Sequence, residues 1–308
     1  MMWKITFFIL LLVWTGTALA AGKSADEVAK ELSNPAGSLA SLFTSIEYTL
    51  YKGDLPDADD QDGFTFSFQP VLPFPVGDKG RNIIFRPLIP VPINQPVFDN
   101  ERGKGKPIKV GHGSHTTYVV PGIGKFDDGD LALGDISFDL VYAGNEMKDK
   151  HNGFLWGIGA AGTFPTATDD DFGGDQWRLG PELFGGIITK LATVGMVLNH
   201  QWNVAGSNDD THSVTAGQYF YAIGLGDGWQ IASGPNFAYD WKADHDQAWT
   251  IPVGLGLAKT AAVGKTKAKF QFQVQYFVEQ PDAFGPEWLF KFTVTPVVMN
   301  PFVKLFKK

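Results

Sequence analysis

Apolar and polar side chains alternate along much of the chain. Residues 268–280 read AKFQFQVQYFVEQ, in which Gln271, Gln273 and Gln275 separate aromatic and aliphatic residues. Successive side chains of a strand point to opposite faces, so the stretch predicts a strand with one apolar and one polar face. Such a strand fits a water-soluble β-sandwich. It also fits a membrane barrel whose apolar face meets lipid and whose polar face meets the lumen.

About twelve stretches show this alternation and predict an all-β chain. In one of them Trp177, Leu179 and Leu183 alternate with Arg178 and Glu182. If the apolar rows face lipid, the polar rows line the interior. The candidate lumen-lining residues are Glu47, Arg86, Asp135, Asp139, Arg178, Glu182, Asn199, Gln201, Asp240, Lys242, Gln271, Gln273, Gln275, Glu279 and Lys291.

The connections between the predicted strands favour the barrel over the sandwich. If the mature N-terminus is periplasmic and the first strand starts near Leu42, the long connections fall on the outer side with short turns near Asp244 and Asp282, and the connections on the inner side are mostly short. The long ones are residues 52–63, 92–130, 164–176 and 204–211, and the short ones include 76–80, 145–152 and 225–228. Outer-membrane barrels have this asymmetry, with short turns on the periplasmic side. We therefore expect a closed antiparallel transmembrane β-barrel of about 12 strands.

Charge adds to this picture. Aspartates gather in the long connections and lysines in the short ones, and the net charge of −8 argues against a nucleic-acid partner. The run DDD at 169–171 lacks the spacing of a calcium loop, so it is interpreted as solvated, and neither a metal nor a cofactor is predicted. We expect residues 98–125 to form an extracellular loop that folds inward as a constriction.

The N-terminus reads as a secretory signal peptide. Lys4 precedes the apolar run ITFFILLLVW, and the small-residue pattern ALA ends at Ala20. The absence of cysteine from the sequence excludes a lipoprotein signal. We divide the chain into a signal peptide (1–20), an N-terminal segment (21–41), the barrel (42–300) and a C-terminal tail (301–308).

The N-terminal segment predicts a short helix. Ser24 is its expected N-cap, Asp26 and Glu27 lie in its first turn, and Pro35 follows its end. Val28 and Leu32 are four residues apart, so one apolar face can dock on the barrel. The helix can enter the barrel as a plug or lie at its rim.

Several motifs follow one another over nearly the whole mature length. They include ELSNPAGSLASL at 31–42, LALGDISF at 131–138, GIGAAGTFPTATDD at 157–170, WTIPVGLGLAK at 249–259 and GPEWLFKFTVTP at 285–296. In these the chain resembles the MetA-pathway of phenol degradation family, also labelled neuromedin-U-like outer-membrane proteins. The resemblance implies an outer-membrane β-barrel with a transport role, linked to uptake of aromatic or other hydrophobic compounds. It implies no catalytic residues.

These inferences predict a function and partners. About twelve strands enclose a wider lumen than the filled interior of an eight-stranded barrel, so we expect a channel for passive uptake of small solutes. The expected partners are outer-membrane lipid, lipopolysaccharide and the barrel-assembly machinery. One alternative is a lipid hydrolase using His112, Ser114 and His115, and another is a structural or adhesive barrel without transport.

Overall fold

The computed structural model shows a β-barrel. It describes residues 22–77, 80–99, 108–110, 117–119, 125–149, 152–206 and 211–300. The signal peptide, the C-terminal tail and the candidate hydrolase residues His112, Ser114 and His115 lie outside the described residues.

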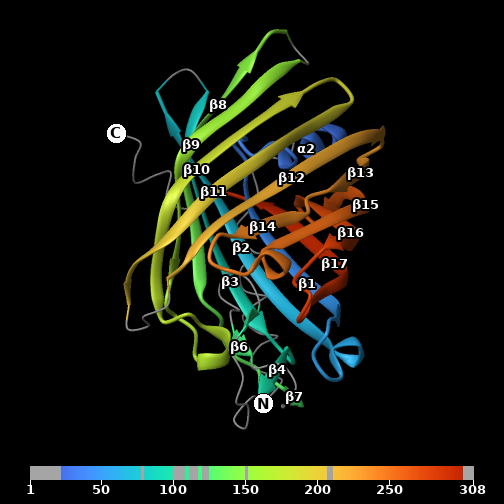
Figure 1. Ribbon diagram of the computed structural model, residues 1–308. Helices are drawn as coiled ribbons and strands as arrows, with labels where there is room; N and C mark the ends of the chain where they lie inside the picture. The colour runs from blue at the N-terminus through green and yellow to red at the C-terminus, as the bar shows by residue number, and fades with distance from the viewer. Residues whose placement is uncertain are drawn as a thin grey trace.

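Twelve antiparallel strands close the barrel, as the alternation predicts (Figure 1). Consecutive barrel strands pair with one another, and β13 and β14 both pair with β12. Across the long connection β3 pairs with β8, and the pairing of β1 with β17 joins the first strand to the last. The barrel strands are β1 (Ala40–Lys52), β2 (Asp62–Val76), β3 (Arg81–Pro92), β8 (Ile136–Met147), β9 (Gly153–Phe164), β10 (Gln176–Ile188), β11 (Ala192–Gly206), β12 (Ser213–Gly226), β13 (Trp229–Ser233), β14 (Asn236–Asp240), β15 (Trp249–Val263), β16 (Thr266–Glu279) and β17 (Gly285–Val298).

One of the twelve strands is interrupted. β13 and β14 occupy a single place between β12 and β15 and are separated by Gly234 and Pro235. Proline has no N–H for the ladder, and a glycine weakens a strand interior. Residues 229–231 and 238–239 pair with β15, whereas the residues between these two stretches do not.

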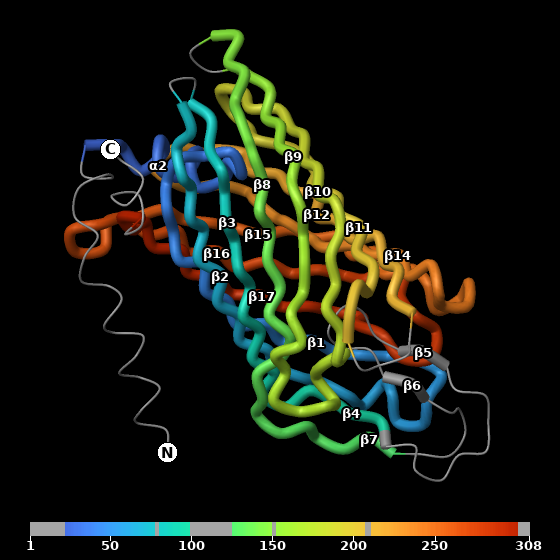
Figure 2. The backbone as a smooth tube through the Cα atoms, turned by 90° about the vertical axis from the view of Figure 1, so that its left-hand side faces the viewer, coloured from blue at the N-terminus to red at the C-terminus, as the bar shows by residue number. Residues whose placement is uncertain are grey.

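The two ends of the barrel differ. At the short-turn end the strands are joined by tight turns, such as those between β12 and β13 and between β15 and β16. The long-loop end carries a ribbon of β4 (Pro96–Asp99) and β7 (Lys125–Asp128), with β5 (Ile108–Val110) paired to β6 (Thr117–Val119). Figure 2 shows this ribbon at the opposite end of the barrel from α2. In the described part of the chain, short 3-10 helices also lie in the connections at this end: η2 (Ala58–Asp60), η3 (Asp170–Phe172) and η4 (His245–Gln247).

The helix α2 (Ala25–Leu32) precedes the first strand, as predicted. Its N-terminus is closed by a capping box. The Ser24 hydroxyl accepts a hydrogen bond from the Glu27 backbone N–H, and the Glu27 carboxylate accepts one from the Ser24 N–H. None of the helices in the described part of the chain is long and apolar enough to cross a membrane.

The barrel exposes apolar side chains on its outside and buries polar ones inside. On β10, Trp177 and Leu183 are 48% and 55% exposed, whereas Arg178 and Glu182 are 4% and 1% exposed. Phe272 on β16 is likewise half exposed, between the partly buried Gln271 and the buried Gln273. This arrangement is the reverse of a soluble protein and suits a surface that meets hydrocarbon.

Aromatic side chains gather near both ends of the barrel's outer surface. Trp156 and Trp229 lie near the short-turn end, on β9 and β13. More tryptophans lie towards the long-loop end: Trp177, Trp202, Trp241, Trp249 and Trp288. Outer-membrane barrels carry such aromatic girdles at the two membrane interfaces.

Candidate functional site: the lumen of the barrel

Two cavities occupy the interior. The loop-side cavity, towards the long-loop end, measures about 590 Å³, and the turn-side cavity, next to the N-terminal segment, about 520 Å³. They meet at a waist, which we define by the residues that line both cavities: Glu47, Ser67, Leu88, Ser137, Asn199, Ala216, Asn236 and Lys291. Two adjoining cavities therefore lie inside the barrel.

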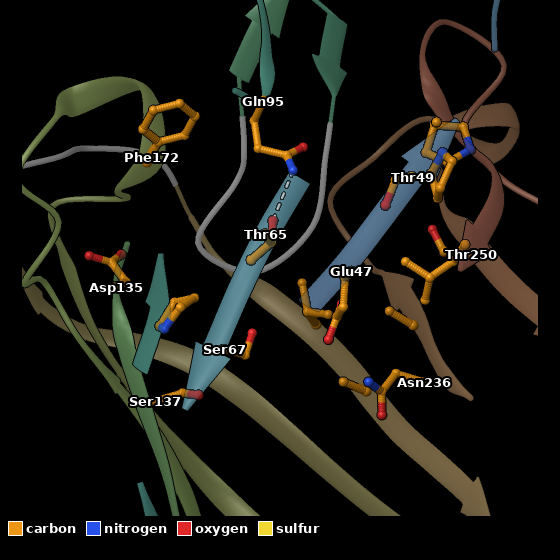
Figure 3. A pocket seen from close by; sticks show the side chains of 18 of the residues that line it. Glu47, Thr49, Thr65, Ser67, Gln95, Asp135, Ser137, Phe172, Asn236 and Thr250 are labelled. Atoms are coloured by element: carbon orange, nitrogen blue, oxygen red, sulfur yellow. Dashed lines mark hydrogen bonds between the residues drawn. The ribbon is translucent and has the colours of Figure 1, made fainter. Parts of the chain in front are cut away.

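The loop-side cavity combines aromatic and polar walls. Phe98, Phe172 and Phe284 line it, and the first of these belongs to the β4–β7 ribbon. Gln95 precedes the ribbon and donates a hydrogen bond to Thr65 on β2, as Figure 3 shows. The ribbon thus contributes to the wall of the cavity, whereas most of the loop predicted to fold inward, 98–125, lies outside the described residues.

Most of the candidate lumen residues line one cavity or the other. Asp135, Arg178, Gln201 and Gln275 line the loop-side cavity. The waist holds Glu47, Asn199 and Lys291. The turn-side cavity is lined by Arg86, Asp139, Glu182, Gln271 and Gln273. The backbone therefore brings side chains from distant parts of the sequence into one interior.

Three candidate residues line neither cavity. Asp240, the last residue of β14, is buried and interacts electrostatically with Arg178. Lys242 follows the end of β14 in a turn and is exposed, and Glu279 is the exposed last residue of β16. Alternation assigns faces only within a strand. The prediction extended the pattern to the end of β16 for Glu279 and past the end of β14 for Lys242. Lys242 is accordingly a correction to the predicted lining.

Charged side chains of the lining pair with one another. Arg86 Nη2 lies 2.8 Å from Asp139 Oδ2 and 3.6 Å from Glu182 Oε1. We call these three residues, from β3, β8 and β10, the charged wall. At the waist, Lys291 Nζ lies 2.6 Å from Glu47 Oε1, between neighbouring strands β17 and β1. The closest contacts therefore join opposite charges on neighbouring strands.

Asp135 anchors the loop between β9 and β10. Its carboxylate accepts hydrogen bonds from three backbone N–H groups, at 3.0 Å from Thr166, 3.1 Å from Ala167 and 2.9 Å from Gly174. Arg178, which is also buried, interacts electrostatically with Asp135. This residue predicted to line the lumen therefore also holds a long loop in place.

Glutamines face the interrupted strand. Gln271 donates to the Ala232 carbonyl at 3.0 Å, and Gln218 donates to the Gly234 carbonyl at 3.1 Å. Gln273 Oε1 accepts from the Ser233 hydroxyl at 2.9 Å. We call Gln218, Gln271 and Gln273 the amide wall. Their amides bond the backbone and side chain of a segment that has lost its ladder partners in β15.

Two tyrosines bridge the same interruption. The Tyr219 hydroxyl donates to the Pro252 carbonyl at 2.9 Å, and the Tyr221 hydroxyl donates to the Gly254 carbonyl at 2.7 Å. Both carbonyls belong to the stretch of β15 that has no ladder pairing with β13 or β14. The side chains of β12 therefore reach across the intervening strand to β15.

The N-terminal segment covers the short-turn end of the lumen. Asn34 donates to the Asn145 side chain at 3.3 Å, and Asn82 on β3 donates to the Ala36 carbonyl at 3.2 Å. Ala36 is fully buried against apolar side chains of five strands, among them Val141 and Phe184. These contacts place the segment within the barrel opening.

The helix is held on the opposite side of this opening. Val28 is fully buried and packs with Leu39 and Val297. Asp26 accepts a hydrogen bond from the Gly228 backbone N–H, in the turn between β12 and β13. Burial lowers the pKa of the Lys30 ammonium, while the Asp149 carboxylate shifts that pKa the other way.

Lys269 is a lining residue that the prediction missed. It is buried in the turn-side cavity and donates to the Ser33 hydroxyl at 3.1 Å. The predicted polar row of β16 began at Gln271, and extending the same alternation back by two residues would have included Lys269. Its partner in the N-terminal segment has no comparable sequence signal.

Comparisons with known proteins bear on the fold. No family model matches the chain, and no curated protein matches it. An outer membrane channel from Pseudomonas putida F1 is similar in structure, with a TM-score of 0.56, 13% identity, and coverage of 85% of this chain and 95% of that one. The NanC porin has a TM-score of 0.42 at 8% identity, covering 83% and 99%. LpxR from Salmonella typhimurium has a TM-score of 0.34 at 10% identity, also covering 83% and 99%.

The Pseudomonas channel and this chain share a closed antiparallel barrel. At 13% identity the likeness extends to the fold and no further.

Proposed function

We propose that the chain is a passive channel of the bacterial outer membrane for small solutes. The observation that carries this proposal is the pair of adjoining cavities inside a barrel whose outer surface is apolar. The structural neighbour from Pseudomonas putida is described as an outer membrane channel, which supports the same role. By the usual asymmetry of such barrels, the short-turn end faces the periplasm and the long-loop end faces outside.

The solutes in this proposal include hydrophobic or aromatic compounds. Aromatic rings line the loop-side cavity, among them Phe98, Phe172 and Phe284. Aromatic faces and edges favour stacked or edge-on contacts with a ring in the solute. The sequence resemblance to the MetA-pathway of phenol degradation family points to the same class of compound. The lipid-hydrolase alternative depends on His112, Ser114 and His115, for which the described residues provide no geometry.

The N-terminal segment acts as a plug in this proposal. It covers the turn-side cavity, is held there by hydrogen bonds and apolar contacts, and continues directly into β1. Solutes that enter from the long-loop end meet this segment last. Its removal is therefore expected to widen the path.

Single-channel conductance in planar bilayers tests the proposal. The mature chain is expected to give small currents, and a variant lacking residues 22–37 is expected to give larger ones. Liposome swelling with neutral solutes should follow the same order. If neither protein conducts ions or admits solutes, the channel function is wrong.

A cysteine pair checks where the plug lies. Asn34→Cys and Asn145→Cys place two thiols where the native side chains are in contact, in a sequence without cysteine. Oxidation is expected to form an internal disulfide, visible as a shift on a non-reducing gel. Pairing Asn34→Cys with Asn203→Cys, near the long-loop end of β11, is the matched control and should not cross-link.

A further inference from the structure

Lys269 brings a positive charge into the turn-side cavity. The side chain lines this cavity from β16 and is 8% exposed, so bulk water reaches little of it. Its Nζ atom donates a hydrogen bond to the Ser33 hydroxyl at 3.1 Å, and it forms no ion pair within the described part of the chain. A buried ammonium with a single neutral partner is costly, and a neighbouring anion lowers that cost.

The other charged residues that line this cavity are balanced. In the charged wall, the two carboxyl groups are hydrogen-bonded to each other, so one proton lies between them and the guanidinium balances the charge that remains. At the waist Lys291 contacts Glu47, and in the N-terminal segment Lys23 contacts Glu31. Of the described residues that line the turn-side cavity, Lys269 is therefore the charged one without a counter-charge.

Hydroxyl groups flank this ammonium. Thr260 on β15 and Thr295 on β17 are the register partners of Lys269, so the three side chains share the inner face. The Cβ atoms of such directly opposed residues lie about 4.5–5.5 Å apart. Thr295 lines the same cavity, and the buried Thr260 hydroxyl has no hydrogen-bond partner among the described residues. An ammonium and a hydroxyl are both donors, and a carboxylate accepts from both.

The turn-side cavity also has an apolar wall close to this point. Phe43 on β1 lines the cavity and lies between the register pairs Ser41–Val297 and Thr44–Val294, which places it level with Thr295. Phe220 on β12 lines the cavity as well. At about 520 Å³ the cavity has the size of a small-molecule pocket. Its walls therefore suit a ligand with one charged end and an apolar body.

We propose that Lys269 and Thr295 bind the carboxylate of a small organic acid whose apolar body lies towards Phe43. The proposal rests on the proposed channel function and deepens it by naming the charged group of a solute. The carboxylate supplies the counter-charge that Lys269 lacks. It also competes with Ser33, the hydrogen-bond partner of this ammonium in the N-terminal segment.

Thermal unfolding of the mature chain in a non-ionic detergent at pH 7 tests the site. Sodium benzoate replaces sodium chloride at constant ionic strength, and benzyl alcohol supplies the same ring without the charge. The wild-type midpoint is expected to rise by a few degrees once benzoate exceeds its dissociation constant about tenfold. Benzyl alcohol should give no such rise, and sodium phosphate of equal ionic strength should give a smaller one.

Four variants separate the charge of Lys269 from its contact with the N-terminal segment. Lys269→Met removes the charge and should abolish the benzoate shift, whereas Lys269→Arg keeps the charge and should retain a shift. Ser33→Ala removes the hydrogen-bond partner and leaves the ammonium, so it should keep the full shift. Lys265→Met, at an exposed lysine in the turn between β15 and β16, is the matched control and should behave as the wild type.

Four results would overturn the site. Equal midpoints in benzoate, benzyl alcohol and chloride would show that no carboxylate binds, and an equal rise in phosphate would mean that any small anion suffices. An unchanged benzoate shift in Lys269→Met would place binding elsewhere. Loss of the shift in Ser33→Ala would mean that it reports the contact with the N-terminal segment. The midpoints do not depend on solute passage, so a barrel that fails to conduct can still show this site, and a conducting one can lack it.

Discussion

The charged wall and the amide wall line the same lumen with polar side chains that have different partners. In the charged wall, Arg86, Asp139 and Glu182 interact with one another across regular strand pairs. In the amide wall, Gln271 and Gln218 bond the backbone of the interrupted strand. One wall therefore pairs ionisable side chains beside intact ladders, and the other replaces missing ladder bonds with side-chain amides.

The difference shows what a polar lumen position can do. A charged side chain in the interior must find a counter-charge, so its partner lies on another strand at the same depth. A neutral amide both donates and accepts, so it can satisfy an N–H or a carbonyl wherever a strand is broken. Substitutions can separate these two roles, and the strands of both walls also carry lipid-facing side chains on their outer side.

Arginine on the lipid face should be equally harmful behind either wall. Leu183 behind the charged wall and Leu255 behind the amide wall are 55% and 64% exposed near the middle of their strands. Leu183→Arg and Leu255→Arg should each lower the free energy of unfolding by about 2–4 kcal/mol if they lie near the bilayer midplane. Urea titration of the protein folded into lipid vesicles measures this.

Asn236→Arg is the control for that pair. Asn236 is exposed to the lumen at the waist, so its substitution should leave insertion unchanged. A small effect of Leu255→Arg beside a large effect of Leu183→Arg would mean that the interrupted side of the barrel does not face hydrocarbon.

Loss of the shared guanidinium should destabilise the charged wall. Arg86→Gln leaves Asp139 and Glu182 side by side without a cation, and removal of one partner of a fully buried pair costs about 3–5 kcal/mol. The pair with Asp139 is partly exposed to the lumen, so we expect about 2 kcal/mol. Adding Asp139→Asn to the variant should recover much of this loss. Unfolding in urea measures both, and no recovery in the double variant would contradict the like-charge explanation.

Periodicity alone predicted the faces of the strands. Trp177 and Leu183 are exposed and Arg178 and Glu182 are buried because a two-residue period assigns faces without knowledge of neighbours. The short capped helix was equally predictable, since its signals are local: Ser24, Glu27 and the following proline. Loop lengths then distinguished the barrel from a sandwich.

Side-chain partners on other strands were not predictable in this way. The pairing of Arg86 with Asp139 depends on β3 and β8 being neighbours, although more than forty residues separate them in the chain. The roles of Gln271 and Gln273 depend on the break at Gly234 and Pro235, because their hydrogen-bond partners Ala232 and Ser233 lie beside it. The contacts of the N-terminal segment likewise join residues with no shared pattern.

Removal of one amide should loosen the interrupted strand locally. Gln271→Ala takes the donor from the Ala232 carbonyl, and we expect a loss of about 1 kcal/mol. Amide hydrogen exchange should quicken around residues 232–234, with β8 and β10 unchanged. Gln275→Ala is the matched control on the same strand, because the Gln275 amide donates at 3.4 Å to the Gln273 side chain and not to the broken strand. Equal amide hydrogen exchange around residues 232–234 in both variants would show that the amide wall does not support the interrupted strand.

The smallest effect is expected from the tyrosines on β12. Tyr221→Phe removes the hydroxyl that donates to the Gly254 carbonyl and leaves the ring in place. Hydrogen bonds between membrane segments contribute about 0.6 kcal/mol on average, so the single variant should lose about that amount, and the double variant with Tyr219→Phe about twice as much. Unfolding in lipid vesicles measures the loss. The double variant should also quicken amide hydrogen exchange at the unpaired residues of β15. If exchange instead quickens more in the strands of the charged wall than in β15, the hydroxyls do not bridge the interruption.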